Sequence, residues 1–464
     1  MTRIDLPEDF LQRMKLLLED EFQSFLDGYE LPPVIGLRIN PLKINAKSFS
    51  EMAPFELTPV PWCQDGFILS GESRPGKHPY HAAGLYYLHD PSAMLAVELL
   101  NPLPGEWVLD LAAAPGGKAT HIVSKMQNQG VFFANEIHPK RVWELAENLE
   151  RWGALNTLIT NETPQRMADT LEECFDKVLL DAPCSGEGMF RKSENARQDW
   201  SLEVVKSCAI RQQGILHQAA RLVKPGGRLV YATCTFSPEE NEGVVAQFLD
   251  THKDFSLEKP PNYFSCGSGR PEWIEDESFR RFEIENTLRC WSHRGMPEGH
   301  FYAILHKSTG SFMEKHKFQN WQHAPKDVQQ LYYDFTIKSL KSMQLPGILC
   351  LERTHLYLIP EEIPALENLH VIRPGLWVGE IKGKRFEPAH ALALALKASQ
   401  AQRVVDFDSR DNMVLAYLHG EQIPARANDC DGWVLITVDG FPLGWGKQAG
   451  NAIKNYYPKG LRWN

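Results

Sequence analysis

Trp107-Val108-Leu109-Asp110-Leu111 runs directly into Ala112-Ala113-Ala114-Pro115-Gly116-Gly117-Lys118. The first part is a short apolar run that predicts a buried strand, and the second is a turn of small residues that leads into a helix. Such a turn lets backbone approach a ligand closely, while the helix presents its N-terminus to a negative group. Its position is the one where open α/β folds bind nucleotides, although the pattern is neither G-x-G-x-x-G nor a phosphate loop.

Outward from this stretch, short apolar runs alternate with helical segments, which is typical of a parallel sheet. The expected strands span residues 107–111, 131–135, 157–160, 177–180 and 228–232. The expected helices span residues 119–127, 140–152, 203–222 and 239–251, and Pro225-Gly226-Gly227 predicts a turn before the fifth strand. We therefore expect a doubly wound α/β unit.

The flanking regions carry weaker patterns. Apolar residues at helical spacing from Phe10 to Phe25 predict one amphipathic helix that ends near Gly28. Residues 34–40 predict a strand, residues 58–83 loops and short strands, and residues 91–100 a helix. After a strand at residues 301–306, the polar residues 307–326 predict a linker to a second domain. Residues 391–397 alternate Ala and Leu, which fits a helix by propensity and a strand by period.

Size and composition exclude several protein classes. A chain of 464 residues exceeds one hydrophobic core and predicts two or three domains. With 43% hydrophobic and 23% charged residues, it is an ordinary globular protein. A net charge of -10 argues against a protein that coats nucleic acid by bulk attraction. The tail is nevertheless locally basic, because residues 441–464 contain Lys447, Lys454, Lys459 and Arg462 and no acid.

The cysteines and the termini indicate a cytoplasmic protein. Nine cysteines, an odd number without the paired spacing of a zinc site, predict free thiols in a reducing compartment and no metal centre. We find neither a secretion signal nor about 18 uninterrupted apolar residues, so we expect no membrane partner. A monomer is the expected state.

Four chemically distinctive residues follow the predicted strands. Glu136 ends the second strand, where an acid can accept hydrogen bonds from both ribose hydroxyls of an adenosine cofactor. Asp181 and Cys184 follow the fourth strand, and Cys234 follows the fifth. A lone strand-end acid is often a solvated charge, and a lone cysteine is more often a small buried hydrophobic residue. Two cysteines at one sheet edge beside a cofactor turn favour function.

A methyltransferase acting on cytosine would use such thiols. Carbon 5 of cytosine is a poor nucleophile, and addition of a thiolate to carbon 6 turns it into an enamine-like carbon that can attack a sulfonium methyl group. A base must then remove the carbon 5 proton before the thiol leaves. A carboxylic acid near N3 would stabilise the adduct, and Asp181 suits that role. These arguments do not rank the two cysteines.

The motifs resemble the RNA cytosine-5 methyltransferases of the Nop/Sun type, and most closely their bacterial RsmF-like branch, which acts on small-subunit ribosomal RNA. The resemblance spans nearly the whole chain. It is carried by Leu37-Arg38-Ile39-Asn40-Pro41-Leu42-Lys43, residues 86–94, 112–118, 181–191 and 233–241, His293-Arg294, and Gly299-His300-Phe301.

The resemblance implies S-adenosylmethionine as the cofactor and a Rossmann-like catalytic domain at residues 91–307. It implies an N-terminal α+β RNA-binding extension at residues 1–90 and a C-terminal region with a PUA-like RNA-binding domain at residues 308–464. It assigns Cys234 as the nucleophile and Cys184 as the residue that assists RNA release. The implied cofactor contacts are Ala112, Ala113, Ala114, Pro115, Gly116, Gly117, Lys118, Glu136 and Asp181.

In the C-terminal region, Gly375-Leu376-Trp377-Val378-Gly379, residues 382–387 and residues 441–462 resemble that RNA-binding extension. Clustered Lys and Arg among Trp and Tyr can contact phosphates and stack on unpaired bases. A solvated basic face over core aromatic residues is the alternative for any single residue.

Two positions depart from the family pattern. Relatives often place an acid near the adenine, where this chain has Thr160-Asn161-Glu162-Thr163, and glutamine is more usual at His89, which we interpret as a core or solvated histidine. The expected substrate is 16S ribosomal RNA or the small ribosomal subunit. The alternatives are the same reaction on transfer RNA or another RNA, and a noncatalytic ribosome assembly factor.

Overall fold

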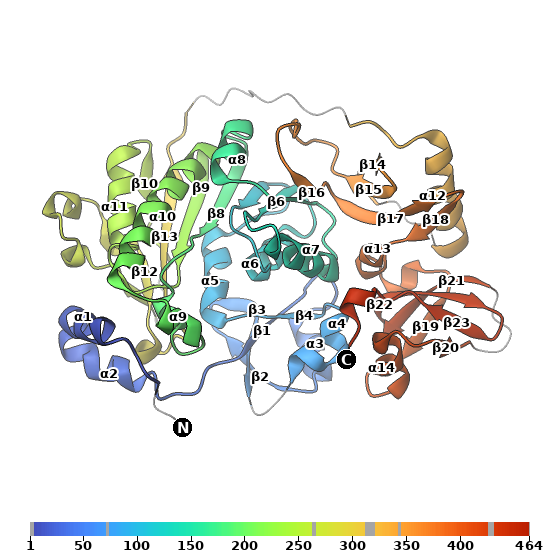
Figure 1. Ribbon diagram of the computed structural model, residues 1–464, viewed down its shortest axis with the longest axis horizontal. Coiled ribbons are helices and arrows are strands. Elements are labelled where there is room, and N and C mark those ends of the chain that lie inside the picture. The colour runs from blue at the N-terminus through green and yellow to red at the C-terminus, as the bar shows by residue number, and fades with distance from the viewer. Residues whose placement is uncertain are drawn as a thin grey trace.

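A computed structural model describes residues 4–70, 74–261, 266–310, 321–341, 345–425 and 431–463. In Figure 1 the molecule is elongated, with a large sheet and its helices at the left and centre, the N-terminal sheet below them, and the C-terminal elements at the right. Within these ranges, every helix is too short or too polar to cross a lipid bilayer.

The centre of the molecule is a ten-stranded sheet. Its strand order is β11-β12-β13-β9-β8-β5-β6-β7-β16, with β10 paired to β13. The pairs within β5 to β9 are parallel, whereas β13 is antiparallel to β9. The strands are β5 (Trp107–Asp110), β6 (Val131–Asn135), β7 (Thr157–Thr160), β8 (Phe175–Asp181), β9 (Val223–Thr233), β10 (Phe255–Leu257), β11 (Cys266–Ser268), β12 (Leu288–Cys290), β13 (His300–Lys307) and β16 (Val371–Arg373).

The sheet has a switch point at β5. This strand pairs with β6 on one side and β8 on the other, so the chain builds one half of the sheet and then returns to build the second. Ligands of open α/β folds bind outside the carboxyl ends of strands at such a point. The predicted doubly wound α/β unit is confirmed.

Helices cover both faces of this sheet because neighbouring side chains point to opposite faces. Phe132 of β6 lies in an apolar cluster with α5, α6 and α7, while Phe133 lies in a cluster with α8, α10 and α11. Each buried large apolar side chain stabilises the fold by roughly 1.5–3 kcal/mol. The helices are α5 (Pro91–Leu100), α6 (Gly117–Met126), α7 (Arg141–Trp152), α8 (Pro164–Thr170), α9 (Glu194–Gln198), α10 (Leu202–Leu222) and α11 (Glu242–Thr251).

The chain begins with two helices rather than the single helix predicted. α1 (Glu8–Leu18) and α2 (Phe22–Asp27) are separated by a 3-10 turn, and the backbone of Glu19 has a φ of 45°, which no continuous helix allows. The apolar spacing nevertheless indicates the buried face of these helices. Phe10 and Phe25 share one buried cluster with Phe236 and Trp291, so these helices pack beside the segment that follows β9.

A four-stranded N-terminal sheet in the order β2-β3-β1-β4 supports the start of α6. Arg38 of β1 is fully buried, donates hydrogen bonds to the Gly117 carbonyl (3.1 Å) and the Thr120 hydroxyl (2.6 Å), and lies over the Trp152 ring. The elements of this region are β1 (Gly36–Ile39), α3 (Ala46–Met52), β2 (Glu56–Val60), β3 (Cys63–Ser70), α4 (Pro79–Ala82) and β4 (Tyr86–Leu88).

The C-terminal region contains two further sheets, in the orders β14-β15-β17-β18 and β19-β21-β22-β23-β20. One of its strands, β16, pairs with β7 and so joins the central sheet. The remaining elements are α12 (Lys326–Ser339), β14 (Ile348–Glu352), β15 (His355–Ile359), β17 (Leu376–Lys382), β18 (Arg385–Pro388), α13 (His390–Ala395), β19 (Val404–Phe407), α14 (Asn412–His419), β20 (Ile423–Pro424), β21 (Gly432–Val438), β22 (Phe441–Ala449) and β23 (Ala452–Asn455).

Several local predictions need correction or completion. The alternating segment 391–397 is mainly helical, in α13. Pro225-Gly226-Gly227 lies inside β9 as an irregularity, where the β8 register shifts from Phe175↔Val223 to Lys177↔Arg228. α11 begins at Glu242, three residues later than expected, because residues 238–241 form a turn. Residues 311–320 of the expected linker lie outside the described residues.

Short 3-10 helices complete the described structure. They span Glu19–Glu21, Pro75–Lys77, Glu187–Met189, Pro271–Trp273, Glu277–Arg281, Ile284–Asn286, Ser292–Arg294, Ala398–Gln400 and Lys459–Leu461.

Candidate active site

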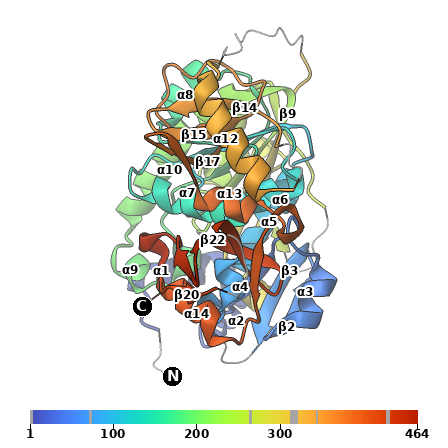
Figure 2. The same cartoon turned by 90° about the vertical axis from the view of Figure 1, so that its right-hand side faces the viewer.

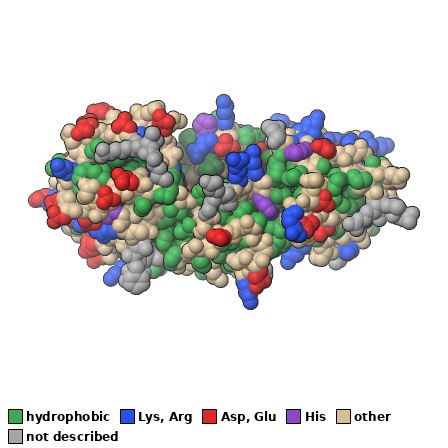
Figure 3. Space-filling view, turned by 90° about the horizontal axis from the view of Figure 1, so that it is seen from below, with side chains coloured by type: hydrophobic (Ala, Val, Ile, Leu, Met, Phe, Trp, Pro, Cys, Tyr) green, Lys and Arg blue, Asp and Glu red, His purple; other side chains and the backbone are tan. Residues whose placement is uncertain are grey.

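The carboxyl ends of three adjacent strands meet at the switch point. β5 ends at Asp110, β8 at Asp181 and β9 at Thr233, and the loops that follow carry the small-residue turn and the two predicted cysteines. Seen from below, the surface is hollowed between the lobe that carries α1 and α2 and the middle of the molecule, and Lys, Arg and His side chains gather beside this hollow (Figure 3).

The structure brings the two cysteines into direct contact. The Sγ atoms of Cys184 and Cys234 are 3.2 Å apart, and the backbone N–H of Cys234 points to the Cys184 sulfur at 3.4 Å. Both residues are partly exposed. The hydrogen bond with Cys234, together with burial and the nearby carboxylate of Glu240, raises the pKa of Cys184 well above its ordinary value. Cys184 is therefore held as a neutral thiol.

An ion pair lies beside these sulfurs. The Nζ atom of Lys118, in the first turn of α6, is 2.6 Å from Oδ2 of Asp181. Burial lowers the pKa of Lys118, but Asp181 and the neighbouring Asp110 and Cys234 outweigh burial and raise it overall. Lys118 is thus a fixed positive charge that interacts with Cys234 and with Asp181.

The turn of small residues is anchored from α7. Arg141 donates a hydrogen bond to the Ala114 carbonyl (2.7 Å), and Asn148 donates one to the Pro115 carbonyl (2.7 Å). Gly116 has a φ of 117°, which disfavours any residue with a side chain. The backbone of the turn is therefore fixed in place by α7.

Two buried carboxyl groups flank the turn. Burial raises the pKa of Asp110 to about 7, and its Oδ2 atom has no hydrogen-bond partner among the described residues. Glu136 is 3% exposed at the end of β6, and its Oε1 atom accepts a hydrogen bond from the His138 N–H at 2.8 Å. An unpaired buried oxygen, a glycine cradle and a strand-end acid fit a bound adenosyl cofactor.

The two unusual positions noted in the sequence have defined environments. His89 is buried, and a Cβ on Gly117 would lie 3.0 Å from its Nε2 atom, so the core interpretation holds. Asn161 donates hydrogen bonds to the Glu136 and Ile137 carbonyls and thereby holds the end of β6. The carboxylate of Glu162 pairs with Arg166 and accepts from the His370 N–H.

Sequence reasoning missed two buried carboxylates behind the cysteines, Glu187 and Glu240. Glu240 accepts hydrogen bonds from the backbone N–H of Ser185 and the side chain of Gln212, and Glu187 accepts from the Phe236 N–H. Glu240 lies in the motif at residues 233–241, which carries the family resemblance but predicts no role for this residue. Its burial depends on contacts between separate loops, which local sequence does not encode.

A second candidate surface lies in the C-terminal half. A groove of about 880 Å³ runs between α12, which faces the viewer in Figure 2, and strands β21 to β23. The rings of Trp433 and Tyr456 meet edge to face at 4.6 Å, with Lys447 over the first and Lys454 over the second. Six basic and three acidic side chains line it, namely Lys338, Lys384, Arg385, Arg403, Lys447, Lys454, Asp334, Glu387 and Asp431.

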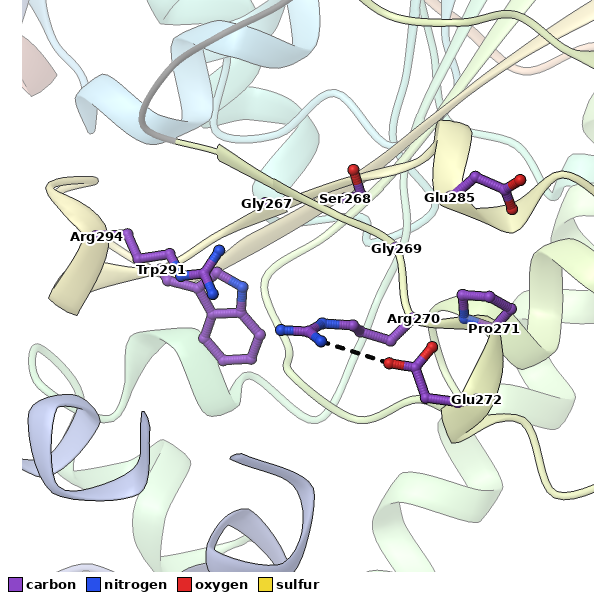
Figure 4. A pocket seen from close by; sticks show the side chains of 9 residues that line it. All are labelled: Gly267, Ser268, Gly269, Arg270, Pro271, Glu272, Glu285, Trp291 and Arg294. Carbon is purple, nitrogen blue, oxygen red and sulfur yellow. Dashed lines mark hydrogen bonds and ion pairs between the residues drawn. The ribbon is translucent and has the colours of Figure 1, made fainter. Parts of the chain in front are cut away.

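A hollow of about 350 Å³ beside β11 has a different character (Figure 4). Its two guanidinium groups are already paired, Arg270 with Glu272 and Glu21, and Arg294 with Glu21. Trp291, on its wall, stacks on Phe236 at 4.8 Å. The wall of this hollow therefore supports the loop after β9. Its paired guanidinium groups offer no free positive charge to an anion.

One group of metal-ligand type occurs among the described residues, formed by Cys63, Glu98 and His121. Glu98 is bonded to His121 (3.1 Å) and to Lys125 (2.6 Å), and the buried Arg38 guanidinium lies close by. The two positive charges disfavour a divalent cation, and we assign the group to internal hydrogen bonding.

Comparison with known proteins gives consistent matches along the chain. Four family models match: the N-terminal domain of 16S rRNA methyltransferase RsmF (residues 6–91), 16S rRNA methyltransferase RsmB/F (97–306), the RsmF rRNA methyltransferase first C-terminal domain (334–396) and the methyltransferase RsmF PUA domain (404–463).

Relatives that match along nearly the whole chain, and a solved structure, agree with these family models. Ribosomal RNA small subunit methyltransferase F of Erwinia tasmaniensis is 33% identical over 99% of this chain and 97% of its own. The protein of that name from Vibrio cholerae serotype O1 is 33% identical over 99% and 98%. A methyltransferase homolog protein from Pyrococcus horikoshii is 31% identical, with a TM-score of 0.58 over 66% of this chain and 96% of that one.

The contact between the two sulfurs predicts a specific cross-link. Mild oxidation with diamide should join Cys184 to Cys234, because their Sγ atoms are 3.2 Å apart and both are partly exposed. Mass spectrometry of tryptic peptides would detect the disulfide. Cys208, which is buried in α10, serves as the internal control that should stay reduced. Oxidised protein in which Cys184 and Cys234 remain separate would contradict this geometry.

Proposed function

This chain belongs to the ribosomal RNA small subunit methyltransferase F family, and we propose that it methylates carbon 5 of a cytidine in 16S ribosomal RNA through a transient Cys234–C6 bond. The observation that carries the proposal is the pair of thiols 3.2 Å apart beside the Lys118–Asp181 ion pair. This arrangement lies at the switch point of a methyltransferase-type sheet.

The cofactor in this proposal is S-adenosylmethionine. The backbone of Ala112, Ala113, Ala114, Pro115, Gly116, Gly117 and Lys118, with the side chains of Glu136 and Asp181, would hold it. The glycine cradle and the unpaired Asp110 oxygen support this assignment. When bound, S-adenosylmethionine supplies an electrophilic methyl group to carbon 5.

The roles of the two cysteines follow from the charges around them. The hydrogen bond with Cys234, burial and the Glu240 carboxylate raise the pKa of Cys184 and favour its thiol, whereas Cys234 is the sulfur that interacts with the positive charge of Lys118. We therefore assign Cys234 as the nucleophile, as the family resemblance implies. DNA cytosine methyltransferases use the cysteine after proline instead, so the electrostatic argument is an independent support.

The reaction then proceeds by addition and elimination. The Cys234 thiolate forms an S–C6 bond, and the displaced electron pair moves toward N3, which takes up a proton through Asp181 and gives it back when the adduct breaks down. After methylation, carbon 5 loses its proton to a base, the C5–C6 double bond re-forms and the S–C6 bond breaks. The Cys184 thiol, hydrogen-bonded to Cys234, stabilises the departing sulfur and so assists release.

The proposed substrate comes from the relatives, whose names specify ribosomal RNA of the small subunit. The target cytidine must be unpaired or flipped, because a duplex hides carbon 5 between stacked neighbours. We propose a cytoplasmic, monomeric enzyme of ribosome biogenesis. We also propose domain boundaries at residues 90 and 307, although β16 from the C-terminal part completes the central sheet.

The C-terminal groove is proposed to hold RNA away from the reacting base. Its surplus of positive side chains contrasts with the net charge of -10 of the whole chain, and Trp433 offers a ring on which an unpaired base can stack. The groove lies beside α12 and β21 to β23, whereas the two cysteines follow β8 and β9 of the central sheet, so one RNA must span the distance between the groove and the cysteines (Figure 1).

The function is tested by mapping 5-methylcytidine in RNA from cells with and without the gene. We expect one 16S ribosomal RNA cytidine to lose its methyl group completely, and plasmid-borne protein to restore it. Loss in transfer RNA alone would select the alternative substrate. Unchanged methylation of all RNA, despite cofactor binding by the purified protein, would favour a noncatalytic assembly factor.

The cysteine assignment predicts two different phenotypes. Cys234→Ser should lower methyl transfer by at least about 100-fold, because the nucleophile is lost. Cys184→Ser should form the adduct but release it slowly, so a covalent protein–RNA complex should survive denaturing electrophoresis. Exchanged phenotypes would contradict the assigned roles, and Cys208→Ser is the matched control that should behave as wild type.

Charge reversal should separate RNA docking from chemistry. Lys384→Glu combined with Lys454→Glu should weaken binding of full-length 16S RNA by about tenfold or more near 0.1 M salt, and should reduce the salt dependence. A short oligonucleotide that carries the target should be methylated as before. Lys253→Glu with Lys259→Glu, at exposed lysines near α11, provides the matched control. Equal effects of both pairs would contradict a specific groove.

A further inference from the structure

Two loops must be aligned for the thiols to meet, and one carboxylate touches both. Oε2 of Glu240 accepts a hydrogen bond from the N–H of Ser185 at 3.0 Å, directly after Cys184. Oε1 of Glu240 accepts from the Thr235 hydroxyl at 3.3 Å, directly after Cys234. The Ser185 and Thr235 hydroxyls are themselves 2.8 Å apart. Glu240 therefore bridges the residues that follow the two cysteines.

Glu240 is itself rigidly held. Gln212 of α10 donates to its Oε2 atom at 2.8 Å, and the Tyr231 hydroxyl donates to its backbone carbonyl at 2.6 Å. The residue is fully buried. A buried carboxylate costs folding free energy unless its surroundings compensate, and burial raises the pKa of Glu240 to about 7.

The charges around the thiol pair are asymmetric. Lys118 of α6 interacts electrostatically with Cys234, whereas the Glu240 carboxylate, bonded to the N–H of the residue after Cys184, interacts with Cys184. The other titratable groups nearby are neutral or of the same sign as Glu240. They are Tyr231 on β9, Cys208 on α10 and Glu187 in the loop after β8. The negative charge of Glu240 therefore favours the protonated form of Cys184.

We propose that Glu240 is a positioning residue of the two-cysteine site, whose buried carboxylate joins the two loops and keeps Cys184 as the protonated partner of Cys234. This inference rests on the proposed function for its meaning in catalysis. In its carboxylate form, Glu240 disfavours a second negative charge on Cys184, which therefore keeps its proton while Cys234 attacks carbon 6. The retained S–H then donates its hydrogen bond to the Cys234 sulfur as the S–C6 bond breaks, so no further proton donor is needed.

The test is the pH dependence of thiol alkylation in the intact protein, which needs no RNA. Iodoacetamide-treated samples between pH 6 and 10 are digested, and the peptides with Cys184 and Cys234 are quantified separately by mass spectrometry. Glu240→Gln should move the half-alkylation pH of Cys184 downward by about one unit or more, because it removes a negative charge at close range.

Two matched variants show whether the lost charge of Glu240 causes the shift of the Cys184 alkylation curve. Glu240→Asp keeps the charge and should keep the Cys184 curve near that of wild type. Glu239→Gln removes the neighbouring carboxylate, which pairs with Arg13 instead, and should leave the curve unchanged. An identical Cys184 curve in wild type and Glu240→Gln would overturn the proposal, as would an equal shift in Glu239→Gln.

A second measurement covers the case in which Glu240→Gln fails to fold. In Cys234→Ala, Glu240 is the group beside Cys184 that ionises near pH 7. Below that pH the neutral carboxyl leaves the thiol easier to ionise, and above it the carboxylate opposes ionisation. The logarithm of the Cys184 alkylation rate should therefore rise with a slope clearly below one through pH 7. A constant slope of one would overturn the proposal.

Methyl transfer gives the catalytic readout. Glu240→Gln should lower kcat by about tenfold or more and accumulate adduct, with the KM for RNA nearly unchanged, and Glu240→Asp should recover part of kcat. Suppose that Glu240→Gln alters the Cys184 alkylation curve but the wild-type protein transfers no methyl group. That outcome would reject the proposed function and keep the electrostatic role of Glu240. A loss of kcat with an unchanged Cys184 alkylation curve would overturn the proposal for Glu240 and leave the proposed function standing.

Discussion

The hydrogen-bond register between β8 and β9 is the constraint on which the site depends. The pairs Leu180↔Tyr231 and Asp181↔Ala232 align the two parallel strands, and the Ala182 N–H continues the ladder to the Ala232 carbonyl at 2.8 Å. Beyond the strands, the Gly188 N–H bonds to the Cys234 carbonyl at 2.9 Å. A slip by one residue would exchange the faces of β9 and separate the two sulfurs.

The flanking regions support the central sheet and the loops of the site from three sides. The buried guanidinium of Arg38 ties the N-terminal sheet to the first turn of α6, from which Lys118 reaches Asp181. Phe10 and Phe25 cover Phe236, which follows the Cys234 loop. At the opposite edge, β16 extends the sheet beyond β7. Each flanking region therefore supports one border of the catalytic sheet.

The sequence predicted the sheet, and the edge of it at which Cys184 and Cys234 lie, because both follow from local periodicity and strand order. Apolar runs gave β5, β6 and β7 nearly to the residue, and the carboxyl ends of parallel strands necessarily share an edge. The break at Glu19 was missed because apolar spacing continued across it, while Ala391 to Ala395 needed tertiary burial to select a helix. Glu240 was missed because its burial depends on contacts with residues distant in sequence, such as Gln212 of α10.

The central claim is that Cys234, and not Cys184, bonds to carbon 6 of the target. Its most direct measurement uses target RNA with 5-fluorocytidine, because carbon 5 then has no proton to lose and the adduct cannot be released. After incubation with S-adenosylmethionine, nuclease and protease digestion would leave one peptide that carries the nucleotide. We expect mass spectrometry to find the nucleotide on Cys234. A nucleotide on Cys184, or a complex with no covalent bond, would contradict the account.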